Sequence, residues 1–326
     1  MAYVHRHFFQ IVRTAAAVIL IISYGHVAWS QTTRAMKFVL PFSAGTSIDT
    51  LARLLAEQIG RTKGQTAVIE SRPGAAGIIA TEAVAGAAPD GNTLLMTPTA
   101  FVVTPQLRKL NYDPLTSFEP VCYLVSVPLV IAVNADSPYR TLADLLNAAR
   151  AKPGDVTLAS IGPGSASQVA FEMLKRAANV DMTFISYPGT PPAVNALLGN
   201  QVTSVLVGYA EVSEQLKAGA LRVLAVATRT RIVALPEVPT VAESGYPGYE
   251  ADIWYGVVAP AKTPKETIAQ LAGMFTAAMQ APEVKAKLVA QGLFPAVMCG
   301  GDFGAFLRKQ YDEFGRVIRE ANIKVE

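Results

Sequence analysis

Three loops rich in glycine and other small residues lie where an apolar run gives way to a helical pattern: Pro41–Asp49, Arg72–Gly77 and Ser160–Ser165. Glycine lets the backbone approach a ligand closely, and hydroxyl side chains add hydrogen-bond donors. The helix after each loop turns its unpaired N–H groups and the positive end of its dipole toward the loop. Each loop is therefore a candidate site for a small anion. A plain turn with an N-cap favours the same residues, so the argument depends on several such loops occurring in one chain.

Two aromatic segments are candidates to line the same site. Tyr187–Ala193 is a fourth loop at a strand exit, and its prolines make it rigid. It is interpreted either as a plain turn or as a wall of the ligand site. Trp254–Gly256, at a strand end, is interpreted as part of the core in preference to a hinge.

The first 30 residues have the pattern of a secretory signal peptide. A basic start is followed by the apolar segment Thr14–Tyr24, which is short for a membrane span, and by the small-x-small motif Ala28-Trp29-Ser30. We therefore interpret residues 1–30 as a signal peptide, in preference to a buried N-terminal helix. The mature chain is expected to begin near Gln31 and to be exported, to the periplasm if the source is Gram-negative.

Removal of that segment limits the chemistry of the mature chain. All three histidines lie within it: His5, His7 and His26. Histidine is the usual general base and the commonest transition-metal ligand, so Ser-His-Asp and Cys-His sites are excluded, although a Ser-Lys site is not. The segment also carries two of the 28 basic residues and none of the 25 acidic ones, which leaves a nearly neutral chain. We expect neither nucleic-acid binding nor a metal.

Nucleotide and hydrolase motifs are missing as well. Gly162-Pro163-Gly164 begins a G-x-G pattern, but no third glycine follows at the spacing of a dinucleotide-binding loop. The sequence has no G-K-[ST] phosphate loop and no G-x-S-x-G nucleophile motif. We expect no cofactor and no enzymatic activity. The two cysteines are too few for a zinc cluster. Cys122 lies in an apolar run and is interpreted as a small buried hydrophobic residue, while its pairing with Cys299 is left open.

Apolar runs of strand length alternate with amphipathic helical patterns along most of the chain, which predicts α/β lobes with mostly parallel sheets flanked by helices. The expected strands are 36–40, 67–70, 93–96, 129–133, 156–160, 183–186, 201–207 and 221–227. The expected helices include 48–59, a short alanine-rich helix before Pro89, a helix from Thr141 to about 152, 165–178, 192–198, a helix from 263 and a last helix over about 302–321.

The chain is long enough for two cores. We predict that residues 31–128 and 255–326 form the first lobe and that residues 129–254 form the second. In open parallel sheets the ligand lies beyond the carboxyl ends of the strands, at helix N-termini. A cleft between the two lobes is therefore the expected binding site.

Several blocks, in order, resemble the receptors of the tripartite tricarboxylate transporter system, the Bug family of periplasmic solute-binding proteins. They are VLPFSAGTSID, ESRPGAAGIIATEAVAGAAPDGNTLLM, YDPLTSFEPV, LASIGPGSASQVAFEMLK, YPGTPPAVNALLGNQV, LKAGALRVLAVAT, LPEVPTVAESGYPGYE and WYGVVAPAKTP. The similarity runs from about Met36 to the C-terminus. It implies a two-lobe Venus-flytrap fold of the type II periplasmic binding proteins. It also implies a monomer that binds a small carboxylate and delivers it to the permease subunits in the membrane.

The resemblance also implies which residues bind the ligand. In the family the loops matching Phe42–Asp49 and Ser160–Ser165 hold it through backbone, hydroxyl groups and ordered water, with Thr97 and Tyr187–Gly189 as supporting walls. The predicted ligand-binding residues are Phe42, Ser43, Ala44, Gly45, Thr46, Asp49, Thr97, Ser160, Gly162, Gly164, Ser165, Tyr187 and Gly189.

The chain departs from the family pattern at four positions. Thr46 stands where the family often has glycine, Gln168 lies near a usual histidine, Pro188 replaces a basic residue, and an acid is missing near Val207. Loss of that acid argues against amine-bearing ligands, so we expect a mono- or dicarboxylate held mainly by helix N-termini. Two alternatives remain: a ligand sensor that feeds a signalling partner, and a secreted hydrolase with a Ser-Lys or paired-carboxylate site.

Overall fold

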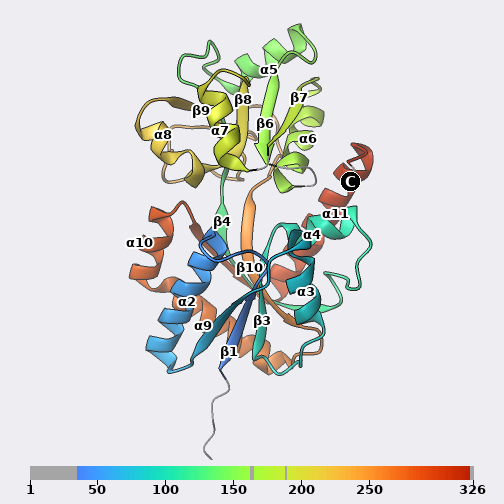
Figure 1. Ribbon diagram of the computed structural model, residues 1–326, viewed down its shortest axis with the longest axis vertical. Coiled ribbons are helices and arrows are strands. Elements are labelled where there is room, and N and C mark those ends of the chain that lie inside the picture. The colour runs from blue at the N-terminus through green and yellow to red at the C-terminus, as the bar shows by residue number, and fades with distance from the viewer. Residues whose placement is uncertain (1–34, 162–164, 188, 324–326) are drawn as a thin grey trace, which may run out of the picture. The chain divides into compact units, whose positions relative to one another are not determined.

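The computed structural model describes residues 35–161, 165–187 and 189–323, so the predicted signal peptide lies outside the described residues. Its strands form two sheets (Figure 1), with the orders β11-β4-β10-β3-β1-β2 and β7-β6-β8-β5-β9. We call each sheet with its helices a lobe. The first sheet takes strands from both ends of the chain and the second takes the middle, while the lobe boundaries given by the sequence remain a prediction.

The first lobe contains six strands and the helices that cover them. The strands are β1 (Met36–Leu40), β2 (Ala67–Ser71), β3 (Thr93–Pro98), β4 (Phe118–Val127), β10 (Ile253–Pro260) and β11 (Phe294–Cys299). The helices are α2 (Ser47–Lys63), the 3₁₀ helix η1 (Ala75–Gly77), α3 (Ile78–Ala85), α4 (Ala100–Leu107), α9 (Lys265–Gln280), α10 (Pro282–Ala290) and α11 (Gly301–Glu320).

The second lobe is smaller and is built from the middle of the chain. Its strands are β5 (Leu129–Asn134), β6 (Thr157–Ile161), β7 (Thr183–Tyr187), β8 (Ser204–Gly208) and β9 (Leu221–Val226). Its helices are α5 (Leu142–Ala151), α6 (Ala166–Ala178), α7 (Thr190–Leu198), the 3₁₀ helix η2 (Tyr209–Glu211) and α8 (Ser213–Lys217).

Both sheets are mixed, so the α/β class is confirmed but the expectation of mostly parallel sheets is wrong. In the first sheet β1 pairs parallel with β2 and β3, whereas β10 and β11 add antiparallel pairs. In the second sheet β6 pairs parallel with β7 and β8, and β5 pairs antiparallel with β8 and β9. The chain passes from the first sheet to the second between β4 and β5 and returns between β9 and β10, and all four of these strands form antiparallel pairs.

Strand alternation distributes the apolar side chains over both faces of the first sheet. Phe38 and Leu40 of β1 face the cluster that contains α2, α9 and α10, whereas Val39 faces the cluster of α3, α4 and α11 (Figure 1). The amphipathic helix predicted over 48–59 is confirmed, and its apolar face is fully buried at Ile48, Leu51, Leu55 and Ile59. Trp254 is also fully buried and packs against Tyr123 and Phe303, which confirms the interpretation of this residue as core.

Cys122 and Cys299 form a disulfide that joins β4 to β11, where the two residues are direct partners in the antiparallel register. Cys122 is fully buried, as its apolar surroundings predicted. The bond closes a loop with a sequence separation of 177 residues. It therefore joins the two chain segments that form the first lobe, which are separated in sequence by the whole of the second lobe.

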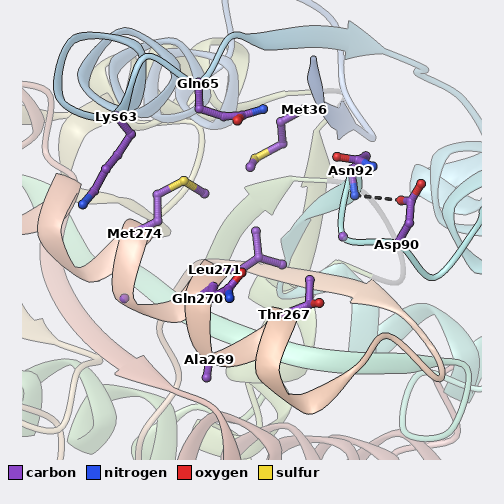
Figure 2. A pocket seen from close by; sticks show the side chains of 12 residues that line it. Met36, Lys63, Gln65, Asp90, Asn92, Thr267, Ala269, Gln270, Leu271 and Met274 are labelled. Carbon is purple, nitrogen blue, oxygen red and sulfur yellow. Dashed lines mark hydrogen bonds between the residues drawn. The ribbon is translucent and has the colours of Figure 1, made fainter. Parts of the chain in front are cut away.

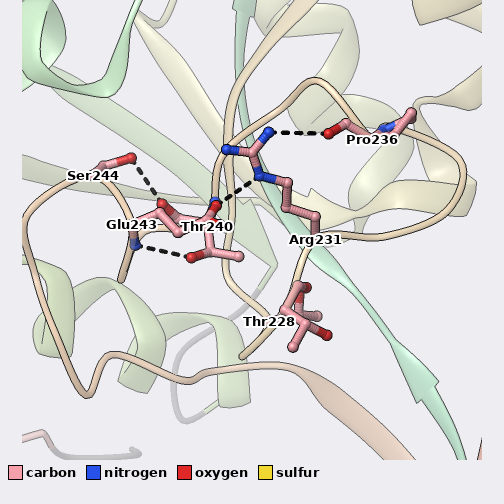
Figure 3. Close-up of polar contacts among 7 residues, drawn as sticks. Thr228, Arg231, Pro236, Thr240, Glu243 and Ser244 are labelled. Atoms are coloured by element: carbon pink, nitrogen blue, oxygen red, sulfur yellow. Dashed lines mark hydrogen bonds and ion pairs between the residues drawn. The ribbon is translucent and has the colours of Figure 1, made fainter.

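Hydrogen bonds and an ion pair fix the long segment between β9 and β10 (Figure 3). The Glu243 carboxylate accepts from the Thr240 backbone N–H at 2.8 Å and pairs with Arg231 at 2.8 Å, and the Glu243 N–H donates back to the Thr240 hydroxyl at 3.0 Å. Hydrogen bonds from the Thr240 backbone and from Arg231 lower the pKa of Glu243. These contacts give the block LPEVPTVAESGYPGYE a structural role in returning the chain to β10.

Gly256 allows β10 to pass close to its neighbours, and alanine at this position is expected to destabilise the fold. A Cβ atom there would lie 2.7 Å from Phe303 Cζ and 2.8 Å from the Cys122 carbonyl oxygen. Overpacking of a core costs about 1–3 kcal/mol, so we expect Gly256→Ala to lower the free energy of unfolding by that amount in urea denaturation. Gly273→Ala is the control, because a Cβ in that part of α9 meets open space and helix propensity favours alanine. Equal stability of Gly256→Ala and the parent would contradict the prediction.

Among the helices described in the structure, none combines the length and apolar character needed to cross a membrane.

Candidate functional site

The carboxyl ends of the parallel strands lie where the chain passes between the sheets. In the first lobe β10 begins beside the end of β3, with Tyr255 opposite Pro98, and β4 ends at Val127 beside Ile253. In the second lobe β5 begins beside the end of β8, with Leu129 opposite Gly208. Pro128 alone separates β4 from β5. The loops after β1, β2 and β3 therefore lie at the edge of the first sheet where the chain passes to and from the second sheet. The loops after β6, β7 and β8 lie at the corresponding edge of the second sheet.

The loop after β1 is open to solvent at its centre. Ser43, Ala44 and Gly45 are exposed, and Thr46 and Phe42 are half-buried. Thr46 is the N-cap residue of α2, but it makes no side-chain capping bond, because its hydroxyl instead donates to the Ser43 carbonyl at 3.0 Å. The N-terminus of α2 therefore presents backbone N–H groups without a side-chain cap, and this is an arrangement that favours an anion.

Asp49 organises this loop from the inside. It is buried, and its Oδ2 accepts from the Gly45 N–H at 2.9 Å and from Arg53 Nε at 3.0 Å. The bond from Arg53 is the main cause that lowers the pKa of the Asp49 carboxyl, and the bond from the Gly45 backbone lowers it further. The arginine offsets the negative charge beside the α2 N-terminus. The predicted residue Asp49 thus shapes the loop with its side chain and does not present it to solvent.

The second loop of the first lobe, Arg72–Gly77, packs against the first. The Arg72 N–H donates to the Leu40 carbonyl at 2.8 Å, and a Cβ at Gly77 would lie 2.9 Å from Pro41 Cβ. Gly77 also has a φ of 92°, a region that favours glycine. The two glycine-bearing loops predicted from the sequence are therefore direct neighbours.

Two further predicted residues direct their hydroxyl groups into the interior. Thr97 is fully buried on β3, and its hydroxyl lies 3.3 Å from the Pro98 carbonyl that accepts from it. Ser160 is also fully buried, and its hydroxyl donates to the Leu206 carbonyl of β8 at 2.6 Å. Both hydroxyl groups thus bond to carbonyl groups of the protein, and the predicted contact of Thr97 and Ser160 with a ligand stays a prediction.

The remaining predicted residues of the second lobe lie at the ends of β6 and β7. Ser165 caps α6, because its hydroxyl accepts from the Gln168 N–H at 3.2 Å while it donates to the Ile161 carbonyl at 2.8 Å. Tyr187 is half-buried at the end of β7, and Gly189 is the N-cap residue of α7. Gly162 and Gly164 lie outside the described residues, as does Pro188.

Two polar contacts at this edge were not predicted from the sequence. The Tyr255 hydroxyl, at the start of β10, forms a 2.7 Å hydrogen bond with the Ser47 hydroxyl in the first turn of α2. In the second lobe Glu211 Oε2 accepts from the Gly208 N–H at 3.2 Å, and its carboxylate also accepts from the Thr190 side chain. An acid three residues after a strand-end glycine is a capping pattern that the sequence does contain.

Glu211 is a solvent-accessible carboxylate in surroundings that disfavour its charge. Desolvation raises its pKa, although the Thr190 side chain and the Gly208 N–H act in the opposite direction. Desolvation also raises the pKa of Tyr255, the Ser47 bond opposes that rise, and the charge of Glu211 adds to it. An acid thus lies near the position where the sequence analysis found one missing, four residues beyond Val207. Because Glu211 is present, an acid missing near Val207 is not a reason to exclude amine-bearing ligands.

A separate hollow of about 660 Å³ lies at the opposite edge of the first sheet (Figure 2). Its lining includes Met36 at the start of β1, Asn92 before β3, and Thr267 on α9. This is the amino edge of the parallel strands. The glycine-bearing loops and helix N-termini of the predicted site lie at the opposite, carboxyl edge. Among the described residues, no group of acidic, cysteine and histidine side chains could hold a metal ion.

Comparison with known proteins identifies the family. The model of the tripartite tricarboxylate transporter family receptor, TctC, matches residues 51–323. The chain belongs to this family. The resemblance found in the sequence is thereby confirmed, and the family is one of solute-binding receptors.

Solved structures of similar binding proteins cover nearly the same length. A TctC solute-binding protein from Polaromonas is 26% identical, with a TM-score of 0.81 over 89% of this chain and 100% of that one. The periplasmic binding protein BugD is 33% identical, with a TM-score of 0.72 over 90% of this chain and 99% of that one. Both likenesses support the two-lobe α/β fold.

Two further similar structures contain a carboxylate ligand. A protein from R. palustris solved with adipate is 32% identical, with a TM-score of 0.73 over 90% of this chain and 99% of that one. MatC from Rhodopseudomonas palustris, solved with malate, is 28% identical, with a TM-score of 0.69 over 87% of this chain and 99% of that one.

Proposed function

We propose that this chain is a periplasmic receptor that captures a small organic carboxylate between its two lobes. It delivers that ligand to the membrane permease subunits of a tripartite tricarboxylate-type transporter. The receptor acts as a monomer and performs no catalysis.

The observation that carries the proposal is the open N-terminus of α2. The loop before this helix is exposed at Ser43–Gly45, and Thr46 leaves the first-turn N–H groups without a side-chain cap. Backbone N–H groups and the helix dipole together favour a carboxylate at such a position. The chain's crossings between the sheets lie at the same edge, so a ligand held there also meets the second lobe.

Two independent features support this assignment. Two proteins of similar sequence and structure were solved with the carboxylates adipate and malate. The Cys122–Cys299 disulfide fits an oxidising compartment, as does the signal peptide predicted for residues 1–30. Export followed by binding in the periplasm accounts for both the Cys122–Cys299 disulfide and the membership in a family of transporter receptors.

The proposal predicts that a negative charge placed in the α2 loop abolishes carboxylate binding. Ala44 is exposed beside the helix N-terminus, so Ala44→Asp would place a carboxylate where the ligand's own carboxylate binds. We expect affinity to fall by about tenfold or more, because like charges at close range repel and the new side chain competes for the same N–H groups. Calorimetric titration of the purified protein with a panel of small mono- and dicarboxylates measures the effect.

Ala88→Asp is the matched control. Ala88 is equally an exposed alanine of the first lobe, but it precedes β3 and lies at the amino edge of the sheet. Its replacement should leave the affinity unchanged. Equal loss of affinity in both variants would point to a long-range charge effect and contradict a site at α2. Failure of every carboxylate to bind the parent protein would overturn the proposed function itself.

A further inference from the structure

Glu211 occupies a central position at the carboxyl edge of the second sheet. It ends η2, which begins directly after β8, and β8 lies between β6 and β5. The Gly208 N–H donates to Glu211 Oε2 at 3.2 Å, and the Thr190 hydroxyl also donates to this carboxylate. Thr190 is the first residue of α7 and is buried. The carboxylate of Glu211 is therefore held at the N-terminus of α7.

The N-terminus of α7 is poorly equipped to bind an anion. Its second and third residues are Pro191 and Pro192, and proline has no N–H group. The N-cap residue Gly189 provides no side chain, and the Thr190 hydroxyl is already used by Glu211. At the N-terminus of α7 the second lobe thus presents a hydrogen-bond acceptor, the Glu211 carboxylate. The N-terminus of α2 in the first lobe presents hydrogen-bond donors, its backbone N–H groups.

Contacts with the first lobe fix the position of η2. The Tyr209 ring lies 6.1 Å from the Phe294 ring of β11, and a Cβ at Gly292 would lie 2.5 Å from Ala210 Cβ. The charge of Glu211 acts on the Tyr255 hydroxyl, which is bonded to Ser47 at the α2 N-terminus. Glu211 and the open end of α2 are therefore arranged around the same tyrosine.

No basic side chain in the described part of the chain offsets the charge of Glu211. Its interactions are with a hydroxyl, a backbone N–H and its desolvated surroundings. A carboxylate in this situation is stabilised by a hydrogen-bond donor or a cation from the ligand. It is destabilised by a second carboxylate, because two like charges in one partly desolvated site raise each other's energy.

We propose that Glu211 determines ligand selectivity: the receptor prefers a carboxylate whose far end carries a hydrogen-bond donor, a hydroxyl or an ammonium group, over the dicarboxylate of the same length. The ligand's carboxylate binds at the α2 N-terminus and its donor group binds Glu211. This inference rests on the proposed function, since it names the ligand class of the same site.

Ligands that differ only at the far end test the proposal. The six-carbon series is adipate, 6-hydroxyhexanoate, 6-aminohexanoate and hexanoate, and the four-carbon series is succinate, 4-hydroxybutanoate, 4-aminobutanoate and butanoate. Each is titrated by calorimetry into the parent protein, Glu211→Gln and Glu214→Gln. Glutamine at 211 keeps an acceptor oxygen for the Gly208 and Thr190 donors but removes the charge. Glu214 is the matched control, because it is an exposed acid three residues further on that pairs with Lys217.

In at least one series the parent protein should bind a hydroxyl- or ammonium-bearing member about tenfold or more tightly than the dicarboxylate. Glu211→Gln should reduce that preference by about tenfold, and Glu214→Gln should leave it unchanged. The hydroxyl and ammonium members separate the two donor types. A thermal unfolding scan checks that Glu211→Gln is folded, and Glu211→Ser provides the same comparison if it is not.

Two results would overturn the selectivity proposal while leaving the proposed function intact. One is a parent protein that binds the dicarboxylates as tightly as the donor-bearing ligands. The other is a preference for donors that survives in the folded variants of Glu211. A parent protein that binds no member of either series would instead contradict the proposed function, and the selectivity proposal with it.

Discussion

Replacing Cys122 and Cys299 together with alanine is expected to lower the free energy of unfolding by about 2–5 kcal/mol. The disulfide closes a loop with a sequence separation of 177 residues, so it removes much of the conformational freedom of the unfolded chain. It also ties β11 to β4 at a register pair, and β11 has no other partner in the described sheet. Without the bond, the last strand of the first lobe is held only by its hydrogen bonds and packing.

Guanidinium denaturation of the parent protein and the double variant measures this effect. The variant should also show a larger dependence of the unfolding free energy on denaturant, because an unfolded chain without the cross-link exposes more surface. The parent protein in dithiothreitol is the control, since reduction removes the bond without changing the side-chain atoms that pack around it. The same unfolding midpoint with and without dithiothreitol would contradict the prediction.

Local patterns predicted the elements that lie in the alternating part of the chain. The expected strand 36–40 coincides with β1, and the expected strands 129–133 and 183–186 each lack only the last residue of β5 and β7. The predicted helix 48–59 lacks the first residue and the last turn of α2, which ends before Gly64 in the left-handed conformation. These elements follow from apolar periodicity and from caps, and both depend on neighbouring residues only.

Elements that depend on distant partners were missed. No strand was predicted for the proline-containing segment 114–128, yet β4 is a ten-residue strand within it. Pro120 is tolerated because it lies at a register irregularity with β10 and beyond the paired part of β11. The antiparallel entry of β10 between β3 and β4, and the addition of β11 at the edge, are not local properties. Without them the sequence predicted mostly parallel sheets.

The sequence located only those parts of the candidate site that depend on neighbouring residues. The loops after β1 and β6 could be located because small residues between a strand and a helix are a local pattern. Glu211 could not, because its importance depends on which strand lies in the middle of the second sheet and on what faces Tyr255. Local patterns also do not show that the side chains of Asp49 and Ser160 are buried and form hydrogen bonds within the protein.

Asp252 is a carboxyl group whose charge opposes folding at neutral pH. It lies just before β10, and its Oδ2 accepts from the Ser126 hydroxyl at 2.6 Å and from the Tyr123 hydroxyl at 3.2 Å. Burial raises its pKa to about 6, and the charge of Glu250 adds to the rise, while the Ser126 bond opposes it. Glu250 in turn pairs with Lys309 at 3.5 Å.

The direction of the pH dependence follows from this raised pKa. An unfolded chain gives this carboxyl its ordinary pKa of 3.8, so between about pH 4 and pH 6 the folded state binds more protons than the unfolded state. The stability that protonation of Asp252 provides is fully present below about pH 4 and is lost as the pH rises through 6. The shift of roughly two pKa units corresponds to at most about 3 kcal/mol.

Asp252→Asn should therefore be more stable than the parent protein at pH 8, by up to about 3 kcal/mol, and this advantage should stay constant down to about pH 6 and shrink as the pH falls from there toward 4.5. Asparagine keeps an oxygen that accepts from Ser126, so the main change is the loss of a partly buried charge. Urea denaturation at several pH values between 4.5 and 8.5 gives the difference directly.

Asp155→Asn, at an exposed aspartate, serves as the control for removing a surface charge. A difference between Asp252→Asn and the parent that stays constant with pH would show that the Asp252 carboxyl keeps its ordinary pKa in the folded protein. A variant less stable at pH 8 would show that the hydrogen bonds of the charged form outweigh its desolvation.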